Sequence, residues 1–442
     1  MYTNIKNLYI FFIILFSIYC ALILGIEWDA RTHLLMGKNR LNYFFSLGSI
    51  NNHSWFAEFF PGLSYTISAF IVQIFPKKIE YEILHLVNLT FSLSAAFAFF
   101  KIMKILFNKE VGLISFVILT LYPAFFGHMS TNPKDTVVAF SFLWIIYYIL
   151  QYLKNQNIAE KRNGYIFKIS ILLVIGSGIR IIFASTLVPI FLFLIVEIFY
   201  FKKILNKKFS NKKFIIDFTK IFFLTYLILI IFWPQVHDNI LTDPFKILLK
   251  MFNSPPVGAP AGLLNGNFYF VTDTPKNYIL INILLRTPEY ILALYFFSLI
   301  FLIQYNSFFI KRFKNFNYKF IFILNILIIS NLVFYFSPIG FYDGLRIFLY
   351  LLPFFLVIPS LCLFLIIKKI SAINFKIIFL IISISFVFFI IRFFSITPYH
   401  YTYLNYINGK SINHSSLFEN DYKGLSLKEL LKKSEHINHK GS

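Results

Sequence analysis

The sequence predicts an all-α polytopic membrane protein with about eleven transmembrane helices. Apolar runs of about 20 residues recur from one end of the chain to the other, and each is long enough to cross the ~30 Å hydrocarbon core of a bilayer. Of the 442 residues, 58% are hydrophobic and only 14% are charged, which excludes a soluble globular protein. Short basic clusters separate the apolar runs, as in the cytoplasmic loops of membrane proteins.

The net charge of +22 follows from this topology and does not indicate a nucleic acid partner. Most of the excess Lys and Arg falls in loops on one side of the membrane, of which KKILNKKFSNKK (residues 202–213) is the strongest. The positive-inside rule then places the N-terminus inside and the C-terminus outside. We therefore expect the protein to lie in a lipid bilayer and to bind no nucleic acid.

The predicted spans can be read from the apolar runs in order. They are Leu8–Ile26, Ile83–Met103, Val111–Phe126, Val137–Leu153, two helices flanking a turn at Gly176–Arg180, Phe214–Phe232, Tyr290–Ile303 with Tyr278–Leu285 as an alternative extension, and three helices that end at SPIGFYDGLR, at Lys368–Lys369 and near Phe394. Pro61–Phe75 is apolar but short for a span. We expect it to be re-entrant or interfacial, because counting it as a span would reverse the charge rule for the later loops.

Asp29 follows the first predicted span and lies in the segment Ile26–Leu41. The spacing of this segment predicts a helix lying flat in the bilayer surface with one apolar side. That side comprises Ala30, Leu34, Gly37, Leu41 and Phe44, and the opposite side comprises Arg31, Lys38 and Asn42. Two interpretations of Asp29 remain open: a solvated acid at a helix end, or a general base that takes a proton from an acceptor hydroxyl as a sugar is transferred.

A second outer cluster contains His128, Asn132, Lys134 and Asp135, at the start of a predicted helix. Asp135 can cap that helix, because an acid at a helix N-terminus meets free N–H groups and the positive end of the dipole. Lys134 runs against the charge rule for an outer loop, and a cation beside a helix N-terminus can hold a phosphate.

A third outer cluster contains Tyr342, Asp343 and Arg346, and Arg180 in an earlier outer turn belongs with it. Arg346 opens a helix, where the dipole disfavours a cation, so a structural role requires a partner such as Asp343. A guanidinium is also a good phosphate clamp. Lys134, Arg180 and Arg346 could surround one phosphate, and a surface salt bridge for each remains the alternative.

The longest non-helical stretch, Trp233–Lys276, offers His237, Asp238 and Tyr269 as sugar-binding groups. Loops of this length are usually functional or disordered. The sequence contains no phosphate loop, no dinucleotide fingerprint and no HExxH helix, and its histidines lack metal-ligand spacing. The use of a divalent cation stays open.

Taken in order, these loops resemble the GT-C superfamily of polyprenyl-phosphate-dependent glycosyltransferases, in its protein-mannosyltransferase and aminoarabinose-transferase-like branch. The resemblance rests on an ordered set of segments that covers nearly the whole chain: Asp29, GHMSTNPKD (Gly127–Asp135), the loop from Trp233 to Pro288 with NGNFY and RTP, YDGLR (Tyr342–Arg346) and FENDYKG (Phe418–Gly424). It implies a GT-C-like helical bundle and an extracytoplasmic active site.

The resemblance further implies that the enzyme transfers a sugar from a polyprenyl-phosphate donor, with inversion, to a glycan, lipid or protein acceptor. Asp29 matches the catalytic acid of the family, and Lys134, Arg346 and Arg180 would hold the donor phosphate. Many members have Glu where this chain has Ala30, which leaves the acceptor class open. The expected transmembrane domain comprises residues 1–397, with extracytoplasmic loops at 27–82 and 233–289. A short extracytoplasmic tail, residues 398–442, follows it. The resemblance implies that the protein lies in a bacterial inner membrane.

Two alternatives remain at this stage. A transporter or flippase of lipid-linked sugars would carry ionisable residues near the bilayer midplane, for which His85 is the main candidate, with Asp217, Glu197 and Arg392 near helix ends. No internal repeat supports it. A non-catalytic relative of the enzymes is the other alternative, and Ala30 is the feature that favours it.

Overall fold

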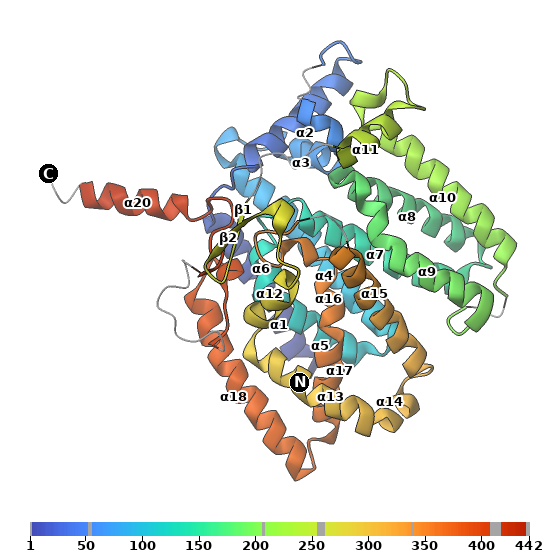
Figure 1. Cartoon of the computed structure of the whole chain (residues 1–442), viewed down its shortest axis with the longest axis vertical. Helices are drawn as coiled ribbons and strands as arrows, with labels where there is room; N and C mark the ends of the chain where they lie inside the picture. Colours follow the sequence, from blue (N-terminus) through green and yellow to red (C-terminus); the bar gives the residue numbers. More distant parts are fainter. Residues whose placement is uncertain are drawn as a thin grey trace.

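The structure is a computed structural model that describes residues 2–51, 55–205, 208–253, 261–336, 340–406 and 417–438. Within these ranges the regular elements are helices and a single β-hairpin (Figure 1). The hairpin pairs β1 (Ala261–Leu264) with β2 (Asn267–Phe270). The α-helices are α1 (Tyr2–Ile23), α2 (Ala30–Phe45), α3 (Leu63–Gln73), α4 (Glu80–Leu106), α5 (Lys109–Thr120), α6 (Pro123–His128), α7 (Asp135–Asn155), α8 (Ala159–Ile179), α9 (Val188–Val196), α10 (Asn211–Ile231), α11 (Asp243–Asn253), α12 (Tyr278–Arg286), α13 (Glu289–Gln304), α14 (Asn306–Arg312), α15 (Phe316–Phe336), α16 (Leu352–Phe355), α17 (Val357–Lys369), α18 (Ile373–Ser395) and α20 (Leu427–Asn438).

Seven helical segments of the described chain are long and apolar enough to cross a membrane. They are Lys77–Leu106, Asp135–Asn155, Ile181–Phe201, Asn211–Ile231, Phe316–Phe336, Leu352–Lys369 and Ile373–Ser395. The pair α12 and α13, bent by 110° at its break, adds an eighth if it forms one broken span. The expected number of about eleven spans is therefore not confirmed.

Three of the expected spans do not form, each for a physical reason, and a fourth is the bent pair α12 and α13. The described apolar part of α1, Leu8–Ile23, is shorter than the ~20 residues that cross a bilayer. The run Val111–Phe126 is interrupted before Pro123, so α5 has only 12 residues. The helix α8 begins with the charged residues Glu160, Lys161 and Arg162, which shortens its apolar part.

The centre of the bundle is α7, which packs against α4 on one side and α8 on the other (Figure 1). Along α4 the alanines at 95, 96 and 98 are fully buried, and such small side chains let neighbouring helices approach closely. Residues of the basic clusters contact other loops: the Lys368 ammonium lies 2.8 Å from Glu110, and Asn315 donates to the Lys203 carbonyl at 3.1 Å. Lys134 directly precedes α7, so the contact between Asp29 and Lys134 lies at the N-terminal end of this central helix.

The helix predicted over Ile26–Leu41 forms as α2, but its apolar side does not face lipid. Leu34 and Leu41 pack on Ala69 and Val72 of α3, the short helix found within Pro61–Phe75. At Gly37 the two helices are so close that a Cβ would overlap the backbone carbonyl oxygen of Tyr65. The interfacial prediction for α2 is therefore corrected: α3, which is too short to cross the bilayer, covers this face.

The predicted C-terminal tail, from residue 398 onward, returns to the body of the protein. The amide of Gly266, in the tight turn of the hairpin, donates to the Leu417 carbonyl at 3.0 Å, and Phe418 forms a β-bridge with Leu264. Tyr422 and Leu425 are buried. This segment brings late residues of the chain to the end of the bundle that holds Asp29.

We predict that Gly37→Ala destabilises the protein. Alanine normally stabilises an exposed helix, but here the added methyl group must displace backbone, and overpacking of this kind costs about 1–3 kcal/mol. Gly164→Ala in α8 is the matched control, because nothing lies within 4 Å of a Cβ at that position. Thermal unfolding in detergent should show a lower Tm for Gly37→Ala and an equal or higher Tm for the control.

Candidate active site

Asp29 lies at the start of α2, and its carboxylate faces two lysines from distant parts of the chain. It is paired with Lys423, and its Oδ2 lies 3.8 Å from the Lys134 ammonium. The side chain does not cap the helix, so helix capping does not explain this acid. Burial alone would raise the pKa of Asp29, but Lys423 and Lys134 lower it overall, so the group is ionised at neutral pH.

Lys134 precedes α7 and is largely buried, with 18% of its side chain exposed. Its ammonium lies 5.1 Å from the centre of the Phe60 ring. Burial and the neighbouring Lys423 ammonium lower the pKa of Lys134 to about 8, and Asp29 only partly opposes them. The site therefore presents a cation that an added anion would stabilise.

Asp135 is a buried carboxylate that binds two guanidinium groups. Arg180 donates to it at 2.5 Å, and Arg346 lies 3.7 Å from its other oxygen. Asn132 donates to Asp135 at 3.0 Å, and the Asn132 side-chain oxygen accepts from the backbone N–H of Asp135. Asn132 therefore accepts an N–H group at the start of α7, and the Asp135 carboxylate, predicted as a cap, pairs with the arginines.

The two arginines differ in solvent exposure, and so in whether a ligand can contact them. Arg180 is 33% exposed, whereas Arg346 is only 3% exposed. Arg346 also lies 3.2 Å from Asp343 and stacks over the Tyr342 ring at 4.2 Å. The partner expected for Arg346 is thus present, and the predicted Tyr342–Asp343–Arg346 cluster forms.

His128 is buried beside the cluster without a charge of its own. Its ring meets the Tyr422 ring edge-on, with the centroids 4.8 Å apart. Burial, helped by the nearby Arg346, lowers the pKa of His128 to about 3, so the imidazole is neutral. It supports the aromatic wall of the site.

The residues predicted from the loop after the seventh span lie apart from Asp29. The ring nitrogens of His237 bond with the Tyr43 hydroxyl at 2.8 Å and the Ile230 carbonyl at 2.9 Å, and Asp238 is exposed. Tyr269 donates to the Phe341 carbonyl at 2.8 Å and lies near Asp343 and Glu419, against the loop that carries Arg346. Of these three residues, the structure thus brings Tyr269 to the third predicted cluster.

Sequence reasoning assigned no role to Lys423, Glu419 or Arg286. Lys423 and Glu419 lie in FENDYKG (Phe418–Gly424), a segment that supported the family resemblance but was given no individual site residue. Glu419 accepts from the Gly344 amide at 2.9 Å and from the Tyr278 hydroxyl at 3.0 Å. Arg286 donates to the backbone carbonyl of Glu419 at 2.8 Å. These contacts fasten the C-terminal segment to the loop that carries Arg346.

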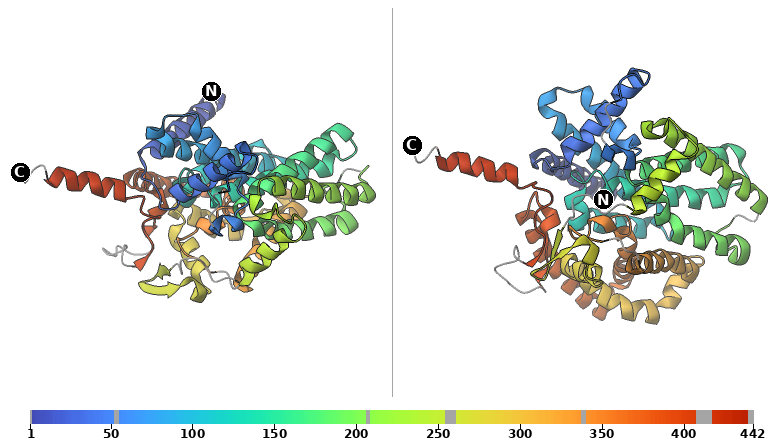
Figure 2. Two further views of the ribbon diagram at one scale, coloured as in Figure 1. Left: turned by 90° about the horizontal axis from the view of Figure 1, so that it is seen from above. Right: turned by 45° about the horizontal axis from the view of Figure 1, so that its top comes forward.

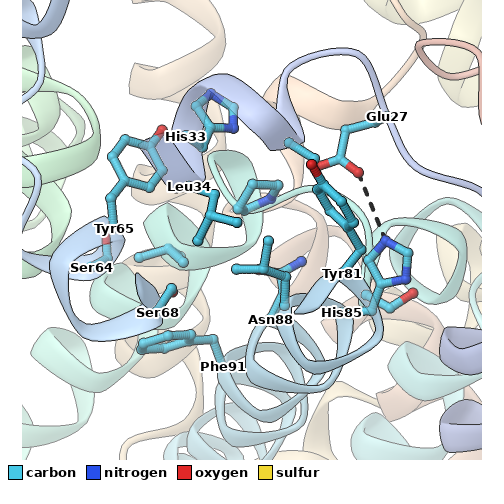
Figure 3. A pocket seen from close by; sticks show the side chains of 15 residues that line it. Glu27, His33, Leu34, Ser64, Tyr65, Ser68, Tyr81, His85, Asn88 and Phe91 are labelled. Atoms are coloured by element: carbon cyan, nitrogen blue, oxygen red, sulfur yellow. Dashed lines mark ion pairs between the residues drawn. The ribbon is translucent and has the colours of Figure 1, made fainter. Parts of the chain in front are cut away.

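A small cavity of about 30 Å³ lies beside Asp29, between α2, α3 and α4 (Figure 3). Glu27 and His85 face each other across one side at 3.8 Å, and the rings of His33 and Tyr65 stack 4.8 Å apart on the other. Five buried polar atoms of its lining have no hydrogen-bond partner in the described part of the chain: Glu27 Oε2, His33 Nδ1, Ser64 Oγ, Tyr65 OH and His85 Nε2. Buried polar atoms are nearly always paired, so this set indicates a place for a polar group or water.

A second, larger cavity of about 460 Å³ lies between α7, α8, α9 and α10. Its lining is mostly aliphatic and aromatic, and Ser177 and Ala184, which flank Arg180 in the sequence, belong to it. One end of this cavity therefore lies near Arg180, which binds Asp135. In the described ranges, no three His, Cys, Asp or Glu side chains are placed to hold a metal ion together.

No protein family and no curated protein sequence matches the chain, but solved structures do. ArnT from Cupriavidus metallidurans, in its apo state and bound to undecaprenyl phosphate, matches with a TM-score of 0.56 and 10% identity. The match covers 82% of this chain and 60% of ArnT. The oligosaccharyltransferase of Archaeoglobus fulgidus matches with a TM-score of 0.51 and 12% identity, over 93% of this chain and 60% of that enzyme.

The chain thus spans 60% of the length of the solved structures that it matches. Both are glycosyltransferases of the GT-C superfamily. At this level of identity the likeness concerns the fold, and it agrees with the resemblance that the ordered loops indicated. The chain has the GT-C fold.

Proposed function

We propose that this protein is a membrane glycosyltransferase that moves a sugar from a polyprenyl-phosphate donor to an acceptor on the extracytoplasmic face, with inversion. The observation that carries this proposal is the convergence of four cations and a partly exposed carboxylate from separate parts of the chain. The cations are Lys134, Arg180, Arg346 and Lys423, and the carboxylate is Asp29.

The donor phosphate would lie among the cations that a ligand can reach. Lys134 and Lys423 converge on Asp29, and Arg180 is the more exposed of the two arginines. Arg346 is buried behind them, between Asp135 and Asp343. We therefore assign Lys134, Lys423 and Arg180 to phosphate contact and Arg346 to the positioning of Asp135.

Asp29 would act as the general base. In an inverting transfer the acceptor oxygen attacks the anomeric carbon, the bond from that carbon to the phosphate oxygen breaks, and the acceptor proton passes to Asp29. The lipid phosphate leaves with the electron pair, and fixed cations stabilise its growing charge. The lowered pKa of Asp29 keeps the carboxylate deprotonated at neutral pH, which is the state that a general base requires.

The small cavity beside Asp29 is suited to one polar substituent of the sugar or of the acceptor. Its volume of about 30 Å³ has room for about two water-sized groups. Glu27 and His85 on one side, with His33 and Ser64 on the other, offer hydrogen-bond donors and acceptors. A hydroxyl or amino group placed there would satisfy atoms that otherwise lack partners.

The apolar groove between α7 and α10 is suited to the polyprenyl tail. Hydrocarbon in this cavity of about 460 Å³ would be covered on several sides by spanning helices, with its head near Arg180. ArnT, which shares the fold, has been solved with undecaprenyl phosphate bound. A phosphorylated polyprenol is accordingly the carrier that we propose.

The transporter alternative receives less support, because three of the ionisable residues that it would use have local partners. The main candidate, His85, donates through Nδ1 to the Ala21 carbonyl at 2.9 Å. Asp217 accepts from the Tyr152 hydroxyl at 2.7 Å and pairs with Arg162 at 3.6 Å. Glu197 accepts backbone N–H groups of Ile204 and Leu205. These contacts fix helix ends and connecting loops.

We predict that Asp29→Asn lowers kcat by about 10²–10⁴-fold and leaves donor binding largely intact, because a general base contributes about that factor. The measurement is sugar transfer from a polyprenyl-phosphate donor in proteoliposomes, with the product identified by mass spectrometry. Asp238→Asn, an exposed acid outside the cluster, is the matched control. Full turnover in Asp29→Asn would remove the proposed base, and translocation of the donor without bond breakage would favour the transporter.

We predict that binding of the carrier undecaprenyl phosphate weakens above pH 8. Lys134 is protonated below its pKa of about 8 and neutral above it, whereas the phosphate monoester of the carrier is already a dianion there. Only the protonated lysine attracts the dianion, so Kd should rise by at most about tenfold per pH unit above pH 8. Titrations with undecaprenyl phosphate across that range test this. Lys134→Arg keeps its charge and should give a flat profile, and an equally flat profile in the unsubstituted protein would contradict the assignment.

We predict different defects for the two arginines. Arg180→Gln should cost less stability than Arg346→Gln, because Arg180 is 33% exposed and Asp135 keeps its contacts with Arg346 and Asn132. It should bind the donor phosphate about 10–100-fold more weakly, the size of one charge-assisted hydrogen bond. Arg346→Gln should destabilise the fold by about 3–5 kcal/mol, because Asp135 and Asp343 lose a buried partner. Thermal unfolding and donor titration of both variants distinguish the roles. The division fails if Arg180→Gln unfolds or Arg346→Gln keeps its Tm.

A further inference from the structure

The helix α20 projects away from the bundle, and only its first turn is held by the body (Figures 1 and 2). Lys428 in that turn donates to the Leu24 carbonyl at the end of α1, at 3.1 Å. Next to it, the backbones of Gly25 and Leu425 are so close that a Cβ at Gly25 would overlap the Leu425 carbonyl oxygen. The backbone N–H of Trp28 donates to the Lys423 carbonyl at 3.1 Å. The start of α20 is thus fixed to the outer end of α1.

The two sides of α20 differ in polarity. At about 100° per residue, Leu427, Leu430, Leu431 and Ser434 fall on one stripe. Leu430 and Leu431 are 62% and 63% exposed. The other side carries Lys428, Glu429, Lys432 and Lys433, of which Glu429 and Lys433 pair at 3.0 Å. An apolar stripe beside lysines is typical of a helix that lies in a membrane surface.

The place of α20 along the membrane normal can be inferred from Trp28. Its indole is 73% exposed and stands just past the outer end of α1. Trp side chains gather at the boundary between hydrocarbon and headgroups. Gly424 contacts the Trp28 ring, so α20 starts at the depth of that boundary.

We propose that α20 lies in the outer surface of the bilayer, with its leucine stripe in the acyl chains and its lysines among the headgroups. The membrane is the occupant because the exposed leucines begin beside the end of α1, whose apolar residues are themselves largely exposed, and beside the exposed Trp28. The same segment holds Lys423 on Asp29. Membrane attachment of α20 thereby supports the position of that lysine, whatever reaction the site performs.

Fluorophores placed on the two sides of α20 test the proposal in the full chain. Ser434→Cys labels the apolar stripe and Lys432→Cys labels the polar side, while the native Cys20 and Cys362 are 4% and 1% exposed and resist labelling. In liposomes of phosphatidylcholine with doxyl-labelled acyl chains, the label at 434 should be quenched strongly and the label at 432 weakly. Equal or absent quenching at the two positions would overturn the proposal.

A second variant separates membrane attachment from folding. Leu430→Ser with Leu431→Ser should abolish quenching at position 434 and leave the Tm of the bundle unchanged, because these leucines lie outside the core. Persistent quenching in this variant would also contradict the proposal. Neither readout depends on catalysis, so a failure here differs from a failure of the proposed function.

Discussion

The arrangement of the site depends on one buried carboxylate, Asp135, at the start of the central helix α7. A carboxylate in this position loses its hydration, and only charged partners can compensate for that loss. Arg180 and Arg346 are those partners, and they come from the end of α8 and from the loop before α16. Asp135 therefore fixes two cations beside the helix N-terminus and leaves the preceding Lys134 facing Asp29.

The charged side chains of the site form a buried inner layer and a more exposed outer layer. In the inner layer, Arg346 is enclosed by Asp135, Asp343 and the Tyr342 ring, so its charge is already compensated. In the outer layer, Lys134 and Lys423 share the single carboxylate of Asp29, so the outer cations exceed the outer acids. An anion that enters the site is attracted by this excess of positive charge in the outer layer. The ion pairs of the inner layer hold the site geometry when the anion binds.

Several residues of the candidate site could be predicted from sequence. Basic residues are expected in cytoplasmic loops, so a lysine or arginine in a predicted outer loop stands out. Lys134 was found in this way, and Arg346 because the helix dipole disfavours a cation at that position. Asp343, the expected partner of Arg346, lies one turn before it, whereas Lys134 pairs with the distant Asp29. Lys423 gave the same signal, but nothing local indicated that its segment returns to α1. The pairing of Glu27 with His85 depends on how α1 meets α4, and such contacts have no sequence signature. The span count failed where a proline or a charged turn shortened an apolar run.

The Asp29–Lys423 pair joins positions 394 residues apart. The seven apolar helical segments of the described chain, from Lys77 to Ser395, all lie between these two residues, so a ribosome releases Asp29 before them and Lys423 after them. During synthesis Asp29 therefore lacks this counter-charge until the intervening helices have been made. Formation of the pair requires those helices to bring both residues to the same side of the bilayer.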